Sequence, residues 1–244
     1  MNKKNIINSI FENIKTIIGA LIIAIIIRSF IFQPFYIPSS SMEPTLLIGD
    51  RIFVSKYTYG FSKHSFPFSP NIFNERIFYK KPEQGDLVVF KTPADNRTDY
   101  IKRLIGLPGD EIQFIEGDIF INNKKILRKK INTNNLVRCG KFSFKVNAYE
   151  EILPNGAKHI AVYNEAGTLQ NTKKFKVPEN HFFLLGDNRD CSKDSRYLGS
   201  VSFVNLVGKA QIIFFSNDTV KGSLLKFWNL KNSFRFDRLF KKIK

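Results

Sequence analysis

The sequence predicts a mainly β domain that follows one N-terminal transmembrane helix, and three observations support this fold class. Residues 17–27 form an apolar run without a charged side chain. From about residue 51 to residue 215, short segments rich in β-branched and aromatic residues alternate with turn signals. Between Pro34 and Asn217, no long segment has the apolar spacing of an amphipathic helix. With 244 residues, of which 43% are hydrophobic, the chain can form one substantial core besides the membrane segment.

The apolar segment near the N-terminus determines how the chain relates to a membrane. Its apolar character extends over residues 14–35 if Lys15 and Arg28 place their charged ends at the two interfaces, and this length can span a bilayer. A cleaved signal peptide and a buried helix are the alternatives. A signal peptide should end in a small-x-small cleavage site, and the only nearby candidate is the serine run 39–41, for which the sequence suggests another use. We therefore expect a retained anchor over residues 14–35.

Basic residues flank the N-terminal end of this anchor, namely Lys3, Lys4 and Lys15. By the positive-inside rule, residues 1–13 are expected to lie in the cytoplasm and the rest of the chain on the other side of the membrane. The downstream part is also basic, but long domains cross largely regardless of their charge.

The formal net charge of +17 suits nucleic acid, an anionic membrane surface or an acidic partner, and does not by itself choose among them. Two cysteines occur, Cys139 and Cys191, without CxxC spacing or a nearby histidine pair, so we expect no structural zinc site. A disulfide between them is compatible with the sequence but is not established by it.

After the anchor, residues 33–50 contain three prolines and a run of serines, which predict an extended, turn-rich entry into the β domain. We expect this domain to cover residues 36–216. Its expected strands are RIFVSKY, DLVVFK, YIKRLIGL, EIQFI, DIFI, HFFLL and AQIIFF. The pair Asn122 and Asn123 predicts a hairpin between DIFI and the following KKIL.

Two segments leave alternatives open. Residues 61–81 hold several phenylalanines among serine, proline and lysine, which form either an exposed lip or part of the packed domain. In the tail, residues 217–244, apolar and basic side chains alternate at roughly helical spacing, which predicts a basic amphipathic helix on anionic lipid or a helix packed on the domain. The apolar positions of this tail are Leu224, Trp228, Leu239, Phe240 and Ile243.

Three further segments combine reactive side chains with residues that control the backbone. The first is the serine-rich turn PSSSMEPTL at 38–46, and the third is the loop GDNRDCSKDSR at 186–196, which follows the apolar HFFLL. Each has an alternative without function, as a linker or as a solvated turn. The many acids and arginines in the loop favour a fixed, hydrogen-bonded conformation.

The second segment is DYIKRLIGLPGD at 99–110. If it forms a strand, alternation places Lys102 on one face with Tyr100 and Leu104, and Arg103 on the opposite face. Whichever face meets the core, at least one of the two cations is expected to lose contact with water. Of the two, a buried lysine is the one that can lose its proton. The alternative is that both extend to solvent.

Together, these three segments resemble the conserved boxes of bacterial type I signal peptidases, also called leader peptidases, in the order of that family and beside its GD and LPGD elements. The resemblance extends from the anchor to about Phe215 and is weakest over about 124–176. It implies an antiparallel β-sheet catalytic domain. It also implies a membrane-bound serine endopeptidase that removes signal peptides from exported preproteins.

The resemblance further implies roles for individual residues. Ser41 matches the nucleophile and Lys102 the general base of a Ser–Lys dyad. Ser39 matches the residue whose hydroxyl joins the backbone N–H of Ser41 in the oxyanion hole. Ser192 matches a serine that hydrogen-bonds the lysine. Four further residues match structural ion pairs around the site, namely Arg103, Asp187, Asp194 and Arg196. Independently of the resemblance, Tyr100 lies on the face of Lys102 in the expected strand and is a suitable neighbour for a lysine of lowered pKa.

The chemistry requires a base, because a serine hydroxyl is a poor nucleophile until its proton is removed. None of the three histidines, His64, His159 and His181, stands in a motif with an acid and a serine, which disfavours a Ser–His–Asp triad. A lysine has a reference pKa of about 10.4, and burial can lower it by ~2–3 units, about 3–4 kcal/mol. We expect Lys102 to lie in an apolar pocket in contact with Ser41, in chemistry that needs neither a metal nor an organic cofactor.

Ser41 lies nine residues beyond Phe32, so even a fully extended chain keeps it within ~30 Å of the bilayer edge. We expect a single-pass protein of the bacterial inner membrane, with its N-terminus in the cytoplasm and its catalytic domain on the periplasmic side. Its expected partners are exported preproteins and the lipid bilayer, not nucleic acid, and it is expected to act as a monomer.

Three alternatives remain. A membrane-tethered basic binding protein explains the charge but not why the three segments occur together. A self-cleaving Ser–Lys repressor should begin with a DNA-reading helical domain rather than a membrane span. An inactive relative is suggested by Cys191, which stands where the family usually has asparagine and puts one contact around the dyad in doubt.

Overall fold

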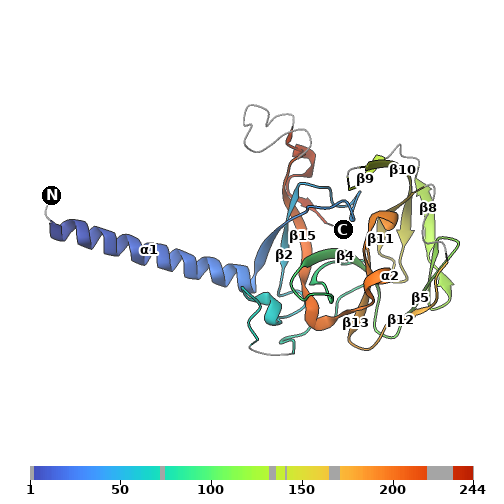
Figure 1. Cartoon of the computed structure of the whole chain (residues 1–244), viewed down its shortest axis with the longest axis horizontal. Coiled ribbons are helices and arrows are strands. Elements are labelled where there is room, and N and C mark those ends of the chain that lie inside the picture. The colour runs from blue at the N-terminus through green and yellow to red at the C-terminus, as the bar shows by residue number, and fades with distance from the viewer. Residues whose placement is uncertain are drawn as a thin grey trace.

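One long helix leads into a body of antiparallel strands, which confirms the predicted fold class (Figure 1). The computed structural model describes residues 3–71, 75–131, 136–140, 142–164, 171–218 and 233–243.

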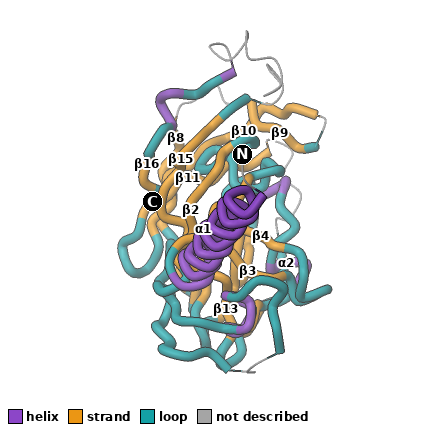
Figure 2. Tube along the Cα trace, turned by 90° about the vertical axis from the view of Figure 1, so that its left-hand side faces the viewer, coloured by secondary structure: helices purple, strands orange, loops and turns teal. Residues whose placement is uncertain are grey.

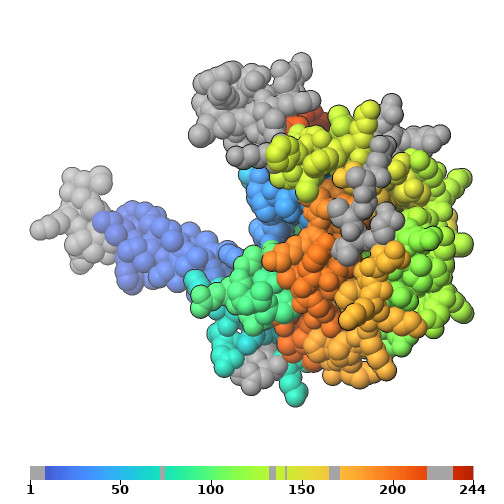
Figure 3. Space-filling view, turned by 45° about the vertical axis from the view of Figure 1, so that its right-hand side comes forward, coloured from blue at the N-terminus to red at the C-terminus, as the bar shows by residue number. Residues whose placement is uncertain are grey.

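Helix α1 (Lys3–Phe30) contains the apolar run near the N-terminus. Residues Ser9–Phe30 are long and apolar enough to cross a membrane, and the rest of the described chain buries none of their most apolar stretch. In Figure 3 this helix projects from the body, and no other part of the chain covers the blue part of the face that is turned to the viewer. An apolar helix segment that no other part of the protein covers is stable in lipid rather than in water.

The helix ends at Phe30, whereas the predicted anchor extended to residue 35. Residues Phe32–Tyr36 form strand β1 instead, which pairs with β2 (Asp50–Ser55). Pro34 explains the difference, because proline has no N–H for a helical hydrogen bond and its ring clashes with the preceding turn. The chain therefore passes from the helix directly into the edge of a sheet.

A strand is present for every segment that was predicted to form one. The remaining strands are β3 (Leu87–Lys91), β4 (Asp99–Gly106), β5 (Glu111–Ile115), β6 (Asp118–Ile121), β7 (Lys124–Lys125), β8 (Leu127–Ile131), β9 (Leu136–Cys139), β10 (Phe142–Ile152), β11 (Lys158–Asn164), β12 (Phe175–Lys176), β13 (His181–Leu185), β14 (Val201–Ser202), β15 (Leu206–Ser216) and β16 (Lys241–Lys242). The short helix α2 covers Ser195–Leu198.

These strands form three sheets in the described chain. The largest has the order β1-β2-β15-β3-β4-β13-β14, with β16 paired to β15. The second has the order β11-β10-β8, with β9 paired to β10, and the third has the order β12-β5-β6-β7. Seen from the side of α1, the strands lie behind the helix (Figure 2).

Two apolar clusters contact β3, whose side chains alternate between them. Leu87 and Val89 belong to one cluster, and Val88 and Phe90 belong to the other. A strand that is buried on both faces has a continuous apolar sequence, as LVVF does. Strand β4 pairs with β3 from Asp99 to its midpoint, so the two cations of the YIKR motif enter the packed interior of the largest sheet.

The predicted hairpin at Asn122 and Asn123 is confirmed. Both residues have positive φ, 53° and 63°, and β6 pairs with β7 across them. Asparagine tolerates the left-handed conformation that such tight turns require.

The C-terminal tail differs from the prediction in its described part. Residues 234–243 contain a short 3-10 turn and strand β16, which pairs with β15, rather than an amphipathic helix. Within this segment, Arg238 donates to the buried carboxylate of Asp50 at 2.6 Å. These contacts with the sheet explain why the alternation of apolar and basic residues did not produce a helix here. Leu224 and Trp228 of the predicted helix lie outside the described residues.

Candidate active site

The side chains of Lys102 and Ser41 meet, although they lie 61 residues apart in the sequence. Nζ of Lys102 donates to Oγ of Ser41 at 2.7 Å and to the carbonyl of Ile101 at 2.9 Å. Lys102 belongs to β4, and Ser41 belongs to the turn that follows β1. The two residues are only 4% and 7% exposed, respectively. The structure therefore forms the contact that was expected between them.

Burial lowers the pKa of Lys102 to about 8, although the carboxylates of Asp194 and Asp187 act in the opposite direction. The ring centroid of Tyr100 lies 5.5 Å from Nζ, as the strand alternation predicted for neighbours on one face. At pH 7, a pKa of about 8 leaves about one lysine in ten neutral, whereas the ordinary value of 10.5 would leave about one in three thousand. A neutral amine beside a hydroxyl can accept its proton.

The turn that holds Ser41 is fixed from two sides. On one side, the next residue, Met42, is fully buried in an apolar cluster of the largest sheet. On the other side, the backbone N–H of Asn188 donates to the Ser41 carbonyl at 3.1 Å. This close approach requires Gly186, because a Cβ there would lie 2.5 Å from the Ser41 carbonyl oxygen and 2.2 Å from Oγ of Ser192. The catalytic loop, defined as residues 186–196, therefore lies directly against the Ser41 turn.

Ser39 and Ser192 differ in how far the structure matches their predicted roles. Oγ of Ser39 lies 3.4 Å from Oγ of Ser41, so the two hydroxyls share one edge of the site. Oγ of Ser192 is buried but has no hydrogen-bond partner within the described residues. The predicted hydrogen bond from Ser192 to Lys102 is therefore not formed.

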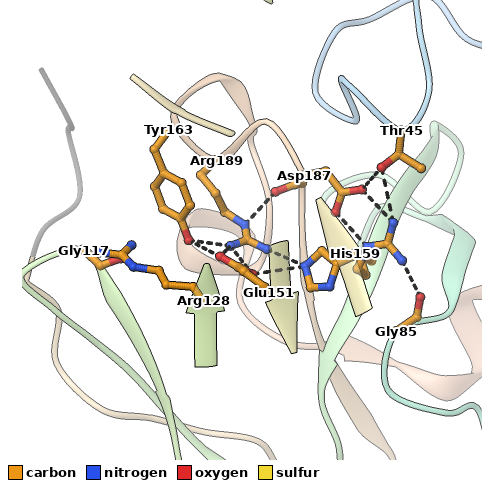
Figure 4. Close-up of polar contacts among 11 residues, drawn as sticks. Thr45, Gly85, Gly117, Arg128, Glu151, His159, Tyr163, Asp187 and Arg189 are labelled. Carbon is orange, nitrogen blue, oxygen red and sulfur yellow. Dashed lines mark hydrogen bonds and ion pairs between the residues drawn. The ribbon is translucent and has the colours of Figure 1, made fainter. Parts of the chain in front are cut away.

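The four residues predicted to form ion pairs do so as two pairs. Arg103 donates to Asp187 from Nε at 2.8 Å and from Nη2 at 2.7 Å, and both side chains are buried. Thr45, in the Ser41 turn, donates to the same carboxylate at 2.5 Å (Figure 4). Burial alone would raise the pKa of Asp187, but Arg103 outweighs it and holds the pKa below its ordinary value. Arg196 donates to Asp194 at 2.8 Å.

A second buried ionic cluster, behind the catalytic loop, was not predicted. Arg189 donates to Glu151 at 2.7 Å, and both side chains are fully buried. Tyr163 donates to Glu151 at 2.5 Å, and Nε2 of His159 lies 3.1 Å from it (Figure 4). Burial alone would raise the pKa of Glu151, but Arg189 and His159 outweigh it and hold the pKa below its ordinary value. Because Glu151 lies on β10 and the other two partners lie on β11, this cluster attaches the loop to the second sheet.

The sequence contained one signal for this cluster. Arg189 stands in the GDNRD motif, and its position four residues after the end of the apolar HFFLL segment indicates that it needs an acidic partner. The partner lies within 124–176, where the family resemblance was weakest, so no motif identified Glu151.

A disulfide joins Cys139, at the end of β9, to Cys191 in the catalytic loop. The sequence alone did not establish whether this bond forms. Next to it, Asn188 donates to the carbonyl of Arg138 at 3.2 Å, and the N–H of Arg138 donates to Glu43 at 3.0 Å. The end of β9 is therefore connected both to the catalytic loop and to the Ser41 turn.

A cavity of about 400 Å³ lies beside the Ser–Lys pair. Ser41 and Lys102 belong to its lining, together with apolar side chains that include Phe35, Val89 and Ile101. Such a lining accommodates small uncharged groups better than charged ones. Within the described ranges, no group of three or more His, Cys, Asp or Glu side chains is placed to hold a metal ion.

A serine hydroxyl in contact with a buried lysine of lowered pKa, at the wall of a cavity, is the arrangement of a serine hydrolase that uses lysine as its base. The fold and the site therefore define this class of protein.

Comparison with known proteins narrows the class to a family. The family model described as signal peptidase, peptidase S26, matches residues 10–215. Signal peptidase I of Rickettsia typhi (strain ATCC VR-144 / Wilmington) is 44% identical over 241 residues, which cover 91% of this chain and 89% of the relative. Signal peptidase I of Rickettsia prowazekii (strain Madrid E) is 41% identical over 266 residues, which cover 100% and 98%. The crystal structure of a signal peptidase I from Enterococcus faecalis V583 matches with a TM-score of 0.32 and 26% identity, over 53% of this chain and 97% of that chain. The chain belongs to the signal peptidase family, peptidase S26.

Replacing Gly186 by alanine should separate the catalytic loop from the Ser41 turn, because the added Cβ has no space between Ser192 and the Ser41 carbonyl. We expect kcat of peptide cleavage to fall by about tenfold or more while the chain still folds. The matched control is Gly19→Ala in α1, where a Cβ meets nothing within 4 Å and activity should be unchanged. A G186A enzyme with the wild-type kcat would contradict this account of the loop.

Removing the Glu151 carboxylate should destabilise the fold, because it leaves the guanidinium of Arg189 buried without its charge partner. We expect Glu151→Ala to lower the free energy of unfolding by about 3–5 kcal/mol, measured by thermal or denaturant unfolding of the full chain in detergent. The double variant Glu151→Met with Arg189→Met should recover a large part of this loss. The control is Glu111→Ala, which removes one partner of the exposed pair with Lys174 and should change the free energy of unfolding by less than about 1 kcal/mol. Equal losses for Glu151 and Glu111 would show that the buried pair is not structural.

Proposed function

We propose that this protein is a membrane-anchored serine endopeptidase that removes signal peptides from exported preproteins, with Ser41 as nucleophile and Lys102 as general base. The observation that carries the proposal is the 2.7 Å contact between the buried Nζ of Lys102 and Oγ of Ser41 at the wall of a cavity. Membership in the signal peptidase family supports the same reaction.

In the proposed first step, neutral Lys102 accepts the proton of the Ser41 hydroxyl as Oγ attacks the scissile carbonyl carbon. The backbone N–H of Ser41 and the hydroxyl of Ser39 would donate to the oxyanion that forms. The lysine ammonium then gives its proton to the leaving amine, and the N-terminal part of the substrate remains as an ester on Ser41. In the second step, neutral Lys102 takes a proton from water, the hydroxide attacks the ester, and Ser41 recovers its proton as the peptide leaves.

The free edge of β4 is a suitable place for an extended substrate. On the side of β4 that faces away from β3, β13 pairs only with Arg103, Leu104 and Gly106. In the described chain, no strand pairs with this side of residues 99–102, which line the active-site cavity. A peptide added along this edge would form main-chain hydrogen bonds and direct alternate side chains into the cavity.

The proposed location follows from the short distance between anchor and site. Residues 1–13 would lie in the cytoplasm, residues 14–35 would contain the anchor, and residues 36–216 would form a periplasmic domain that acts as a monomer. Because Ser41 lies nine residues after the start of β1 at Phe32, it stays within about 30 Å of the membrane edge. A signal peptide presents its cleavage site just outside its own apolar segment, at a similar level.

Processing of a preprotein by the full chain in detergent tests the proposed dyad. Ser41→Ala and Lys102→Met should each reduce the cleavage rate by about a thousandfold or more, because each removes one half of the proton-transfer pair. The matched control is Ser40→Ala, since the only hydrogen bond of the Ser40 hydroxyl in the described chain is with the sulfur of Cys191, at 3.9 Å. This variant should stay within about threefold of the wild type. Undiminished cleavage by Ser41→Ala, or cleavage elsewhere than at the end of the signal peptide, would contradict the proposal.

A further inference from the structure

A second cavity, of about 340 Å³, lies where α1 joins the β domain. Its wall comes from the last turn of α1, from β1, from the loop 64–69 and from the turn between β3 and β4. The beginning of this loop, near the short helix at 63–65, lies beside the inner end of α1 (Figure 1). The cavity shares Phe35 and Asp99 with the active-site cavity, but Ser41 and Lys102 do not line it.

The wall of this junction cavity carries an excess of positive charge. Arg28, Lys91 and Arg97 belong to it, and Asp99 is its one carboxylate. Asp99 pairs with Lys91 at 2.9 Å. Among the residues that the structure describes, no carboxylate lies within ion-pair distance of Arg28 or Arg97. The cavity therefore has two guanidinium groups without an acidic partner.

The positive charge of this cavity contributes to a lowered pKa of a neighbouring buried lysine. Lys56 is 1% exposed, and its Nζ donates to the carbonyl of Ser65. Its pKa is lowered to about 8, first by burial and then by repulsion from Arg28. Lys91 acts in the same direction, while Asp99 acts against it. The cavity is thus a region of positive potential in which an anion would be stabilised.

The backbone that presents Arg97 is held in place before any ligand arrives. The carboxylate of Asp95 accepts the N–H groups of Arg97 at 2.9 Å and of Thr98 at 3.0 Å. Arg97 therefore loses little backbone freedom on binding an anion, and its planar guanidinium matches the geometry of a phosphate group.

Two features favour a lipid as the source of that phosphate. Arg28 lies in the last turn of α1, two residues before the membrane-spanning stretch ends at Phe30, which is the level of lipid headgroups. The rim of the cavity is apolar: Phe66 packs against Phe30 with ring centroids 5.6 Å apart, while Phe68 is fully exposed. Residues 61–81 thus contain both packed and exposed aromatics. An apolar rim beside two guanidinium groups fits the boundary between the acyl chains and the headgroups of a bilayer. A free phosphate ion would gain no binding energy from the apolar rim.

We propose that the junction cavity binds the phosphate group of an anionic phospholipid, with Arg28 and Arg97 as its two ligating cations. The inference rests on the proposed anchoring of α1 in a membrane but does not depend on the peptidase reaction. A lipid bound there would fix the height and tilt of the β domain over the bilayer, and with them the position of Ser41 relative to an emerging signal peptide.

Native mass spectrometry of the full chain in uncharged detergent, titrated with phosphatidylglycerol or phosphatidylcholine, tests the proposal. We expect the wild type to retain one phosphatidylglycerol about tenfold more tightly than one phosphatidylcholine. The double variant Arg28→Gln with Arg97→Gln should lose this preference. The control, Lys129→Gln with Lys130→Gln, removes the same charge from exposed positions on β8, on the side of the body opposite α1, and should keep the preference (Figure 1).

Three results would overturn the proposal. The first is equal retention of the two lipids by the wild type. The second is an undiminished preference in the double variant. The third is displacement of phosphatidylglycerol by an equal concentration of glycerol 3-phosphate, which would identify a free phosphate as the ligand. If the double variant melts at a lower temperature than the wild type, the single variants R28Q and R97Q are tested in its place. Each is expected to lower the preference for phosphatidylglycerol by about threefold or more. Lipid retention is read without turnover, so an inactive enzyme would leave this test intact.

Discussion

The burial of Lys102 beside Ser41 is the constraint on which the rest of the structure depends. A lysine that loses its water also loses the stabilisation of its charge, and a pKa lowered from 10.5 to about 8 corresponds to about 3 kcal/mol. This cost is acceptable only in a rigid place, because a flexible strand would let the ammonium return to solvent. Strand β4 provides that place, since it pairs with β3 at Lys102 itself and with β13 from Arg103 onward, inside the largest sheet.

The serine half of the pair needs a different kind of support, because Ser41 lies on an irregular turn. The catalytic loop supplies this support through contacts with separate parts of the fold. Asp187 links it to β4 through Arg103, Arg189 links it to the second sheet through Glu151, and a disulfide links it to the end of β9. A loop attached at so many points can hold Asn188 against the Ser41 carbonyl. The buried ion pairs thus fix the position of the loop. Because each charge in these pairs has a partner of opposite sign, none carries the free-energy penalty of an unpaired buried ion.

The sequence predicted those features that arise from local patterns. Strand alternation placed Lys102 on the face of Tyr100, the paired asparagines predicted the hairpin, and the apolar run predicted the helix. The pairing of Lys102 with Ser41 came from the family resemblance, since no local pattern relates residues that lie 61 positions apart. The partners of Arg189 were missed for the same reason. In the tail, helical spacing was outweighed by backbone pairing with β15 and by the Arg238–Asp50 ion pair, which a periodicity argument does not contain.

The pH dependence of kcat/KM for a signal-peptide substrate tests whether burial prepares Lys102 to accept the proton of Ser41. In the proposed mechanism the neutral lysine is the reactive form, so a rising pH removes its proton and increases the rate. We expect the rate to rise through an apparent pKa of about 8 and to level off about one unit higher, with no such step in a variant that lacks Lys102. A profile that is flat across this range, or that rises only near the ordinary lysine value of 10.5, would show that burial does not prepare Lys102 to act on Ser41.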